Sequence, residues 1–125
     1  MNAHQHLILC IDDDQDILEY LKLTLEANGY RVSTAGSAEE GLKRYGQERP
    51  DLIIVDLMME EVDTGTQFCK ELRALGNEAP IYMLSSIGDS LMREADVSAF
   101  GLSGVFQKPL NKERLLKVLD ERLKK

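Results

Sequence analysis

Hydrophobic residues along the chain alternate between short continuous runs and stretches in which they recur every three or four positions. Short runs rich in Ile, Val and Leu are typical of strands, and the longer periodic stretches are typical of amphipathic helices. The expected strands are Leu7 to Ile11, Tyr30 to Thr34, Leu52 to Asp56, Ile81 to Leu84 and Gly104 to Gln107. The expected helices carry Leu18, Leu21 and Leu25; Leu42 and Tyr45; Phe68, Leu72 and Leu75; Leu91, Met92 and Ala95; and Leu115, Leu119 and Leu123.

Polar residues between these segments indicate where helices begin. Asp13 or Asp14 can cap the first helix, because a short side chain with an oxygen accepts from the free amides of the first turn. Ser37 with Glu40 has the spacing of a capping box for the second helix. Asn111 can cap the last helix in the same way.

Five strands that alternate with five helices indicate an α/β fold with a doubly wound parallel sheet, because right-handed crossovers place helices on both faces. The uninterrupted Leu-Ile-Ile-Val of residues 52–55 predicts a strand buried on both faces. Residues 30–34 alternate in polarity, like a strand near an edge. The 125 residues have room for one domain, 1–125, and we expect residues 1–6 to form a flexible start.

Composition narrows the partners and the compartment. Lys and Arg total 15 and Asp and Glu total 22, so the net charge of -7 disfavours general binding to nucleic acid or to an anionic membrane. The chain has neither the ~20-residue apolar run of a membrane span nor a secretory signal at its start, so we expect a cytoplasmic protein. Cys10 and Cys69 lie in apolar segments without a Cys-x-x-Cys spacing and are expected to be reduced thiols in the core.

Three acidic residues follow two of the expected strands directly. Asp12 and Asp13 come after the first strand, and Asp56 ends the third. The carboxyl ends of parallel strands meet at one edge of a sheet, so these carboxylates are expected to lie together. Their mutual repulsion requires a proton or a hard divalent cation, and a site with two or three protein oxygens suits Mg²⁺.

A hydroxyl and a cation follow the other two strands at the same edge. Ser85 follows the fourth strand and can donate to an anionic oxygen, and Lys108 follows the fifth and adds a positive charge. A metal, a lysine and a hydroxyl around one carboxylate form a site for a phosphoryl group. Asp56 is then the expected nucleophile, and Asp12 and Asp13 are expected to hold the metal.

Four segments together resemble the receiver domain of two-component response regulators. They are LCIDDD at residues 9–14, PDLIIVDLMM at 50–59, MLSS at 83–86 and KPL at 108–110. Each segment alone is a weak signal, but four in order, each at the carboxyl end of a strand, are highly specific. The resemblance covers the chain from about residue 7 to residue 123.

This resemblance implies a CheY-like sheet in the order 2-1-3-4-5 and a phosphorylation switch. Asp56 would accept a phosphoryl group from the phosphohistidine of a sensor histidine kinase or a histidine phosphotransfer protein. Hydrolysis of the acyl phosphate would reset the switch. The chain would thus catalyse its own phosphorylation and dephosphorylation, while acting mainly as a signalling protein on a downstream protein partner.

The resemblance also implies a role for each residue of the site. The implied ligands of Mg²⁺ are Asp13, Asp56, the main-chain carbonyl of Met58 and, through water, Asp12. Lys108 and Ser85 would contact the phosphoryl group. The bond before Pro109 is typically cis in such domains.

Two positions depart from the family pattern. In the loop expected over residues 58–65, Glu60 stands where many receivers have proline, and Thr64 separates an Asp and a Gly that are usually adjacent. We expect this loop to be less rigid and to alter Mg²⁺ affinity, which a Glu60→Pro variant tests. Val105 stands where most receivers have a switching Tyr or Phe, and strand alternation places the neighbouring Phe106 on the opposite face.

Several functions remain open at this point. We expect a phosphorylation switch that stands alone, unless the sequence is a fragment of a longer regulator. A binding-only pseudo-receiver is the alternative, although its usual mark, loss of an acidic residue or of the lysine, is missing here. An aspartyl phosphatase would need an Asp where Met58 stands, and a flavodoxin-like carrier would need a glycine- and hydroxyl-rich loop in place of residues 12–14.

Overall fold

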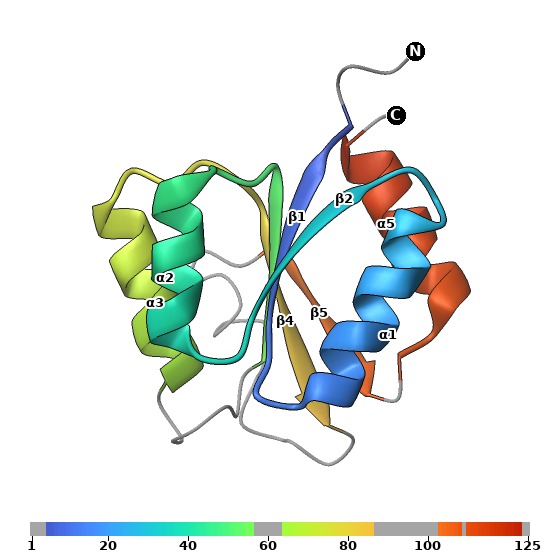
Figure 1. Cartoon of the computed structure of the whole chain (residues 1–125), viewed down its shortest axis with the longest axis horizontal. Coiled ribbons are helices and arrows are strands. Elements are labelled where there is room, and N and C mark those ends of the chain that lie inside the picture. The colour runs from blue at the N-terminus through green and yellow to red at the C-terminus, as the bar shows by residue number, and fades with distance from the viewer. Residues whose placement is uncertain (1–4, 57–63, 87–102, 109, 124–125) are drawn as a thin grey trace.

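The computed structural model describes residues 5–56, 64–86, 103–108 and 110–123, and for residues 64–67, 85, 86 and 108 it describes the backbone alone. From residue 7 to residue 86, strands and helices alternate along the chain (Figure 1). The strands are β1 (Leu7–Ile11), β2 (Arg31–Ala35), β3 (Leu52–Asp56), β4 (Ile81–Ser86) and β5 (Gly104–Lys108). The helices are α1 (Gln15–Glu26), α2 (Ala38–Gln47), α3 (Thr64–Ala74) and α5 (Lys112–Leu123).

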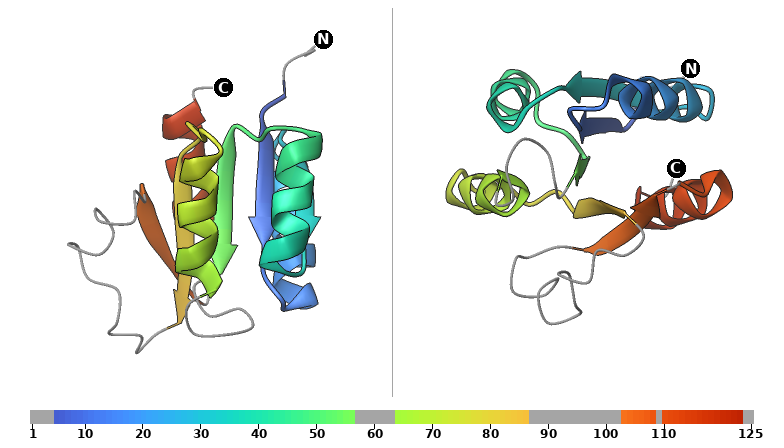
Figure 2. Two further views of the ribbon diagram at one scale, coloured as in Figure 1. Left: turned by 90° about the vertical axis from the view of Figure 1, so that its left-hand side faces the viewer. Right: turned by 90° about the horizontal axis from the view of Figure 1, so that it is seen from below.

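The five strands form one sheet in the order β2-β1-β3-β4-β5, and every neighbouring pair is parallel. Figure 2 shows all the arrows pointing towards the same pole. The predicted parallel sheet and its order 2-1-3-4-5 are therefore confirmed. The chain order reverses between β1 and β3, and in open α/β sheets ligands bind beyond the carboxyl ends of the strands at such a reversal.

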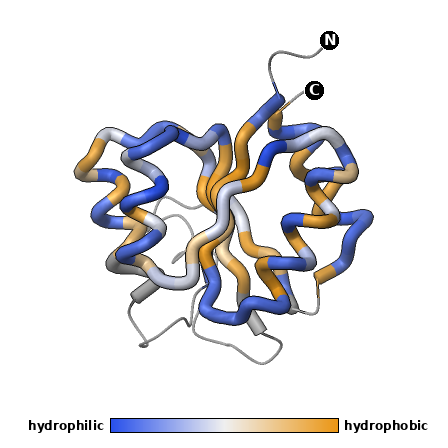
Figure 3. The backbone as a smooth tube through the Cα atoms, viewed as in Figure 1, coloured by the Kyte–Doolittle hydropathy of each residue, from blue (hydrophilic) through white to orange (hydrophobic). Residues whose placement is uncertain are grey.

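Helices cover both faces of the sheet. In Figures 1 and 2, α1 and α5 lie on one side and α2 and α3 on the other. Each pair of helices buries its apolar stripe on the strands, so that the core has two clusters separated by the sheet. Figure 3 shows the same pattern as apolar strands between helices of mixed polarity. Burial of this apolar surface is the main stabilising contribution to the fold.

The sequence predicted the burial of the strands well. β3 is buried along its whole length, and β2 lies at an edge of the sheet, as expected. β2 starts one residue later than predicted. Tyr30 does not enter the ladder because its amide donates to the carbonyl of Leu25 at the end of α1. The ladder begins instead with the bond from the Arg31 amide to the His6 carbonyl.

Side-chain caps begin three of the helices. Asp14, one of the two predicted candidates, caps α1 by accepting from the Asp16 amide at 2.9 Å. Ser37 Oγ accepts from the Glu40 amide at the start of α2, and Asn111 Oδ1 accepts from the Arg114 amide at the start of α5. These bonds satisfy amides that the first helical turn leaves without an intrahelical partner.

The predicted loop over residues 58–65 was wrong at its end, because α3 already begins at Thr64 and includes Gly65. A glycine destabilises a helix mainly when it lies in the interior of the helix. Gly65 lies in the first turn, where the amides have no intrahelical partners, so its low helix propensity costs little. α3 ends at Ala74, and Gly76 follows it with a φ of 84°, a left-handed conformation that glycine adopts readily.

Some expectations lie outside the described residues. These are the helix expected around Leu91 and Ala95, residues 58–63 of the loop, and residues 1–4 of the expected flexible start. Gln5 and His6, which are described, contact Gly29 and Asp51 respectively. Among the described helices, none is both long enough and apolar enough to cross a bilayer.

Candidate functional site

Three carboxylates meet at the carboxyl edge of the sheet, at the reversal between β1 and β3. Asp12 and Asp13 follow the last residue of β1, and Asp56 ends β3. Ile11 pairs with Val55, so the next residues along both strands, Asp12 and Asp56, lie side by side. One oxygen from each of Asp12, Asp13 and Asp56 lies within 4.8 Å of the other two. The predicted gathering of these acids is therefore confirmed; we call these three residues the acid cluster.

Asp12 is held by main-chain groups on both sides. Its amide donates to the carbonyl of Ala35 at 3.1 Å, across the end of β2. Its Oδ1 accepts from the amide of Asp14 at 2.9 Å, and its Oδ2 is buried. These bonds fix both the backbone and the rotamer of a carboxylate that is fully buried.

Exposure differs among the three acids. Asp12 is 0% exposed and Asp56 is 6% exposed, whereas Asp13 is open to solvent. The cluster can therefore be reached from the side of Asp13, while Asp12 forms its floor. Burial, with the charge of Asp12 as a smaller cause, raises the pKa of the neighbouring Cys10 thiol to about 12. Cys10 therefore stays protonated and adds no charge of its own to the site.

The donor set fits a small hard cation. Carboxylate oxygens are the ligands that Mg²⁺ prefers, and three protein oxygens leave positions for water or a phosphate oxygen. Bringing three anions within 4.8 Å is costly unless a positive charge compensates them. The acid cluster could therefore hold such an ion.

Ser85 and Lys108 are placed by the backbone of the neighbouring strands. Leu84 pairs with Asp56, so Ser85 comes one residue beyond Asp56 at the same edge of the sheet. Lys108 ends β5 and pairs with Ser86. The sheet thus brings both residues to the edge that holds the acid cluster. Their side chains, and the whole of Met58, lie outside the part of the chain that the structure describes.

The two neighbouring residues of β5 lie on opposite faces of the sheet, as predicted. Val105 packs against the core cluster on the side of α2 and α3. Phe106 is buried in the other cluster, where its ring stacks on Tyr82 with 5.1 Å between ring centroids. The aromatic side chain in this part of β5 therefore faces α1 and α5, and the face that carries a ring in most receivers carries Val105.

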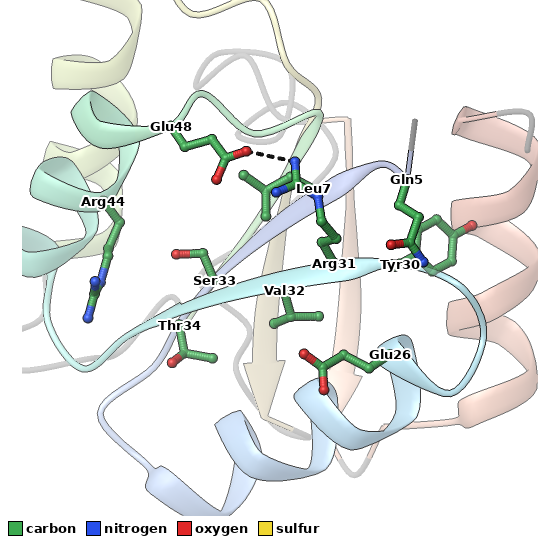
Figure 4. A pocket seen from close by; sticks show the side chains of 10 residues that line it. All are labelled: Gln5, Leu7, Glu26, Tyr30, Arg31, Val32, Ser33, Thr34, Arg44 and Glu48. Carbon is green, nitrogen blue, oxygen red and sulfur yellow. Dashed lines mark hydrogen bonds and ion pairs between the residues drawn. The ribbon is translucent and has the colours of Figure 1, made fainter. Parts of the chain in front are cut away.

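Two features of the structure could not be predicted from the sequence. The carbonyl of Ala35 accepts a hydrogen bond from the Asp12 amide. Every residue has such a carbonyl, so the residue type does not reveal this contact. A polar hollow of about 640 Å³ lies along the open edge of β2, away from the acid cluster. Arg31 and Glu48, which both line the hollow, form an ion pair (Figure 4), and the distance between the guanidinium and the carboxylate is 2.7 Å.

Comparison of the sequence with known families and proteins agrees with this geometry. The family model of the response regulator receiver domain matches residues 8–120. Response regulator MprA of Mycobacterium leprae is 36% identical over 109 residues, which make up 87% of this chain and 47% of that protein. MprA of Mycobacterium tuberculosis is also 36% identical, over 87% of this chain and 46% of its own length. The chain therefore spans about half the length of these curated relatives.

Solved structures give the same result for the fold. The chemotaxis response regulator CheY4 of Vibrio cholerae has a TM-score of 0.83 and 34% identity, over 95% of this chain and 99% of that one. A two-component response regulator from Clostridium difficile has a TM-score of 0.86 and 27% identity, over 97% and 98% of the two chains. With the acid cluster at the reversal of a 2-1-3-4-5 sheet and a family model that spans residues 8–120, this chain belongs to the response regulator receiver domain family of two-component systems.

Proposed function

We propose that this domain is a phosphoacceptor in a two-component phosphorelay and that Asp56 carries the phosphoryl group. The donor is the phosphohistidine of a sensor histidine kinase or of a histidine phosphotransfer protein. The phosphorylated and free states differ in how they bind a downstream protein partner. The observation that carries this proposal is the acid cluster, in which oxygens of Asp12, Asp13 and Asp56 lie within 4.8 Å of one another.

Burial and position favour Asp56 over its neighbours as the nucleophile. Asp12 is fully buried and its Oδ1 already accepts from the Asp14 amide, which makes it a poor attacking group. Asp13 is exposed and is better placed to hold a cation at the mouth of the cluster. Asp56 ends β3, in the middle of the sheet, between the acids that follow β1 and Ser85 in β4.

The transfer is a displacement at phosphorus. A carboxylate oxygen of Asp56 attacks the phosphorus atom while the bond from phosphorus to the histidine nitrogen breaks. The electron pair leaves with the imidazole, which takes up a proton, and Asp56 becomes an acyl phosphate. Attack by water on phosphorus later releases inorganic phosphate and restores the carboxylate.

The other residues of the site reduce the repulsion between the acids and the incoming phosphoryl group. Asp13, Asp56 and the main-chain carbonyl of Met58 would hold Mg²⁺, with Asp12 acting through water. When bound, Mg²⁺ offsets the negative charge on the carboxylates and on the phosphoryl oxygens. Lys108 contributes a permanent positive charge, and the Ser85 hydroxyl donates a hydrogen bond to a phosphoryl oxygen.

The partners and the compartment are part of the same proposal. The named relatives are roughly twice as long as this chain. The downstream protein partner is therefore proposed from the receiver domain alone. Both cysteines are buried free thiols, which fits the reducing cytoplasm. A histidine kinase or phosphotransfer protein in that compartment is the partner that the site chemistry requires.

Intact mass measurement after incubation with acetyl phosphate and Mg²⁺ tests this proposal. We expect the parent protein to gain one phosphoryl group and Asp56→Asn to gain none. Asp16→Asn is the matched control, since Asp16 is an exposed acid in the first turn of α1 outside the acid cluster and the change in charge and size is the same. Equal labelling of the parent and Asp56→Asn would reject Asp56, and labelling of neither would indicate a binding-only domain.

A further inference from the structure

The turn between β2 and α2 contacts the acid cluster through the main chain. The carbonyl of Ala35, the last residue of β2, accepts from the amide of Asp12 at 3.1 Å. Figure 1 shows this turn and the turn from β1 into α1 at the same pole of the sheet. The position of Asp12 therefore depends on how the peptide group after Ala35 is oriented.

The same peptide group is held on its other side by Glu40. Glu40 Oε1 accepts from the amide of Gly36 at 2.9 Å. The Ala35 carbonyl and the Gly36 amide belong to one planar peptide unit, so they cannot rotate independently. A single rigid plane thus joins the Glu40 carboxylate to the Asp12 amide.

This contact differs from an ordinary capping box. In that motif the residue three after the N-cap bonds back to the amide of the N-cap itself. Here the N-cap is Ser37, and its Oγ accepts from the Glu40 amide at 3.1 Å. The Glu40 side chain instead reaches one residue further, to Gly36, and so orients the peptide that supports Asp12.

Two further groups lie close to this arrangement. A Cβ atom at Gly36 would lie 3.3 Å from Gln15 Nε2 and 3.8 Å from Glu40 Oε1, so the turn is packed between the start of α1 and Glu40. Glu40 Oε2 lies 3.4 Å from the Arg44 guanidinium, one helical turn later.

The bond from the Gly36 amide to the Glu40 carboxylate also makes the Ala35 carbonyl, in the same peptide unit, a stronger acceptor for the Asp12 amide, because hydrogen bonds in a chain polarise one another.

We propose that Glu40 is a positioning residue for the acid cluster, acting through the Ala35–Gly36 peptide on Asp12. Glu40 touches neither a metal nor a phosphoryl group in this role. Its effect on the Asp12 amide stands on the described contacts alone. Its consequence for Mg²⁺ binding rests on the proposed function.

Amide hydrogen exchange in the metal-free protein tests the positioning role directly. Glu40→Ala removes the acceptor, and we expect the Asp12 amide to exchange roughly five- to tenfold faster, as for the loss of one net hydrogen bond. Glu40→Gln keeps an acceptor oxygen of the same reach, and we expect it to restore the parent rate to within about twofold. The amide of Leu119, a buried residue in α5 away from both Glu40 and Asn77, is the internal reference that separates local from global opening.

A matched control removes comparable bonds at the opposite pole. Asn77 makes two side-chain bonds to the main chain of Ala79, at 3.0 and 3.1 Å, before β4 begins. Asn77→Ala removes these bonds without touching the Glu40 contact, so we expect the Asp12 amide to keep its exchange rate relative to that of Leu119. An unchanged Asp12 amide in Glu40→Ala, or an equally fast one in Glu40→Gln, would overturn the proposal.

Mg²⁺ titration followed by NMR provides the second measurement. We expect Glu40→Ala to weaken Mg²⁺ binding several-fold and Glu40→Gln and Asn77→Ala to leave it within about twofold of the parent. Parent-like Mg²⁺ affinity in Glu40→Ala, despite faster exchange at Asp12, would overturn the extension to the metal. A parent protein that binds no Mg²⁺ would contradict the proposed function, and the exchange rates would still decide the role of Glu40.

Discussion

The hydroxyl of Tyr30 donates a hydrogen bond to Oδ1 of Asp120, although the two residues lie 90 positions apart in the chain. The oxygen atoms are 2.5 Å apart. Tyr30 is 2% exposed and immediately precedes β2, whereas Asp120 lies in α5. The bond therefore joins the edge of the sheet to the last helix, across the face that α1 and α5 cover.

Tyr30→Phe keeps the buried ring and removes only this bond. We expect a loss of about 1–2 kcal/mol in the free energy of unfolding, the usual range for a hydrogen bond to a charged acceptor that is partly solvated. Chemical denaturation measures it. Tyr20→Phe is the control, since Tyr20 is 38% exposed on α1 and its loss should be near zero. Equal stability of Tyr30→Phe and the parent would show that the bond contributes nothing.

The same bond predicts a dependence of stability on alkaline pH. Burial, followed by the hydrogen bond to Asp120, raises the pKa of the Tyr30 hydroxyl well above its usual value. Above about pH 10 the unfolded chain loses this proton before the folded one does, so stability falls as pH rises. The difference in stability between the parent and Tyr30→Phe should therefore shrink from pH 9 towards pH 11. A constant difference over that range would contradict the raised pKa.

Two glycines of α2 give a paired test of packing. A Cβ at Gly41 would lie 2.7 Å from Ile11 Cδ1 and 3.2 Å from Phe68 Cε1, whereas a Cβ at Gly46 meets nothing within 4 Å. We expect Gly41→Ala to destabilise the fold by roughly 1–2 kcal/mol through overpacking. Gly46→Ala should stabilise it by about 0.5–1 kcal/mol through helix propensity. Urea denaturation of both variants checks this, and two effects of the same sign would contradict it.

Mg²⁺ should stabilise the folded domain if the acid cluster binds it. A ligand that binds only the folded state raises the free energy of unfolding. Once the ligand concentration exceeds the dissociation constant, this increase grows with the logarithm of the concentration. We expect Mg²⁺ to raise the thermal midpoint of the parent, and Asp13→Asn to lose most of this increase. Asp16→Asn, another exposed acid at the start of α1, should keep it. The same increase in both variants would place the metal elsewhere.

The sequence predicted the local features of this fold. Continuous apolar runs identified the strands, since β1 and β3 are buried throughout, and short polar residues identified the caps at Ser37 and Asn111. The gathering of Asp12 and Asp56 could also be predicted, because both follow strands that are neighbours in the predicted sheet. These features depend on residue type and spacing along a few positions of the chain.

Features that depend on distant or main-chain groups could not be predicted in this way. The bond between Tyr30 and Asp120 requires the packing angle of α5, which no local pattern encodes. The support of Asp12 by the Ala35 carbonyl uses a group that every residue carries. α3 begins at Thr64, within the loop predicted over residues 58–65, because a glycine in the first helical turn costs little.

The central claim is that Asp56, and neither of its acidic neighbours, carries the phosphoryl group. An acyl phosphate is reduced by borohydride to an alcohol, so a phosphorylated aspartate becomes homoserine, which peptide mass spectrometry locates in the chain. After incubation with acetyl phosphate and Mg²⁺ and then borohydride, we expect homoserine at position 56 alone. Homoserine at position 12 or 13, or its absence from a protein that has gained a phosphoryl group, would contradict the claim.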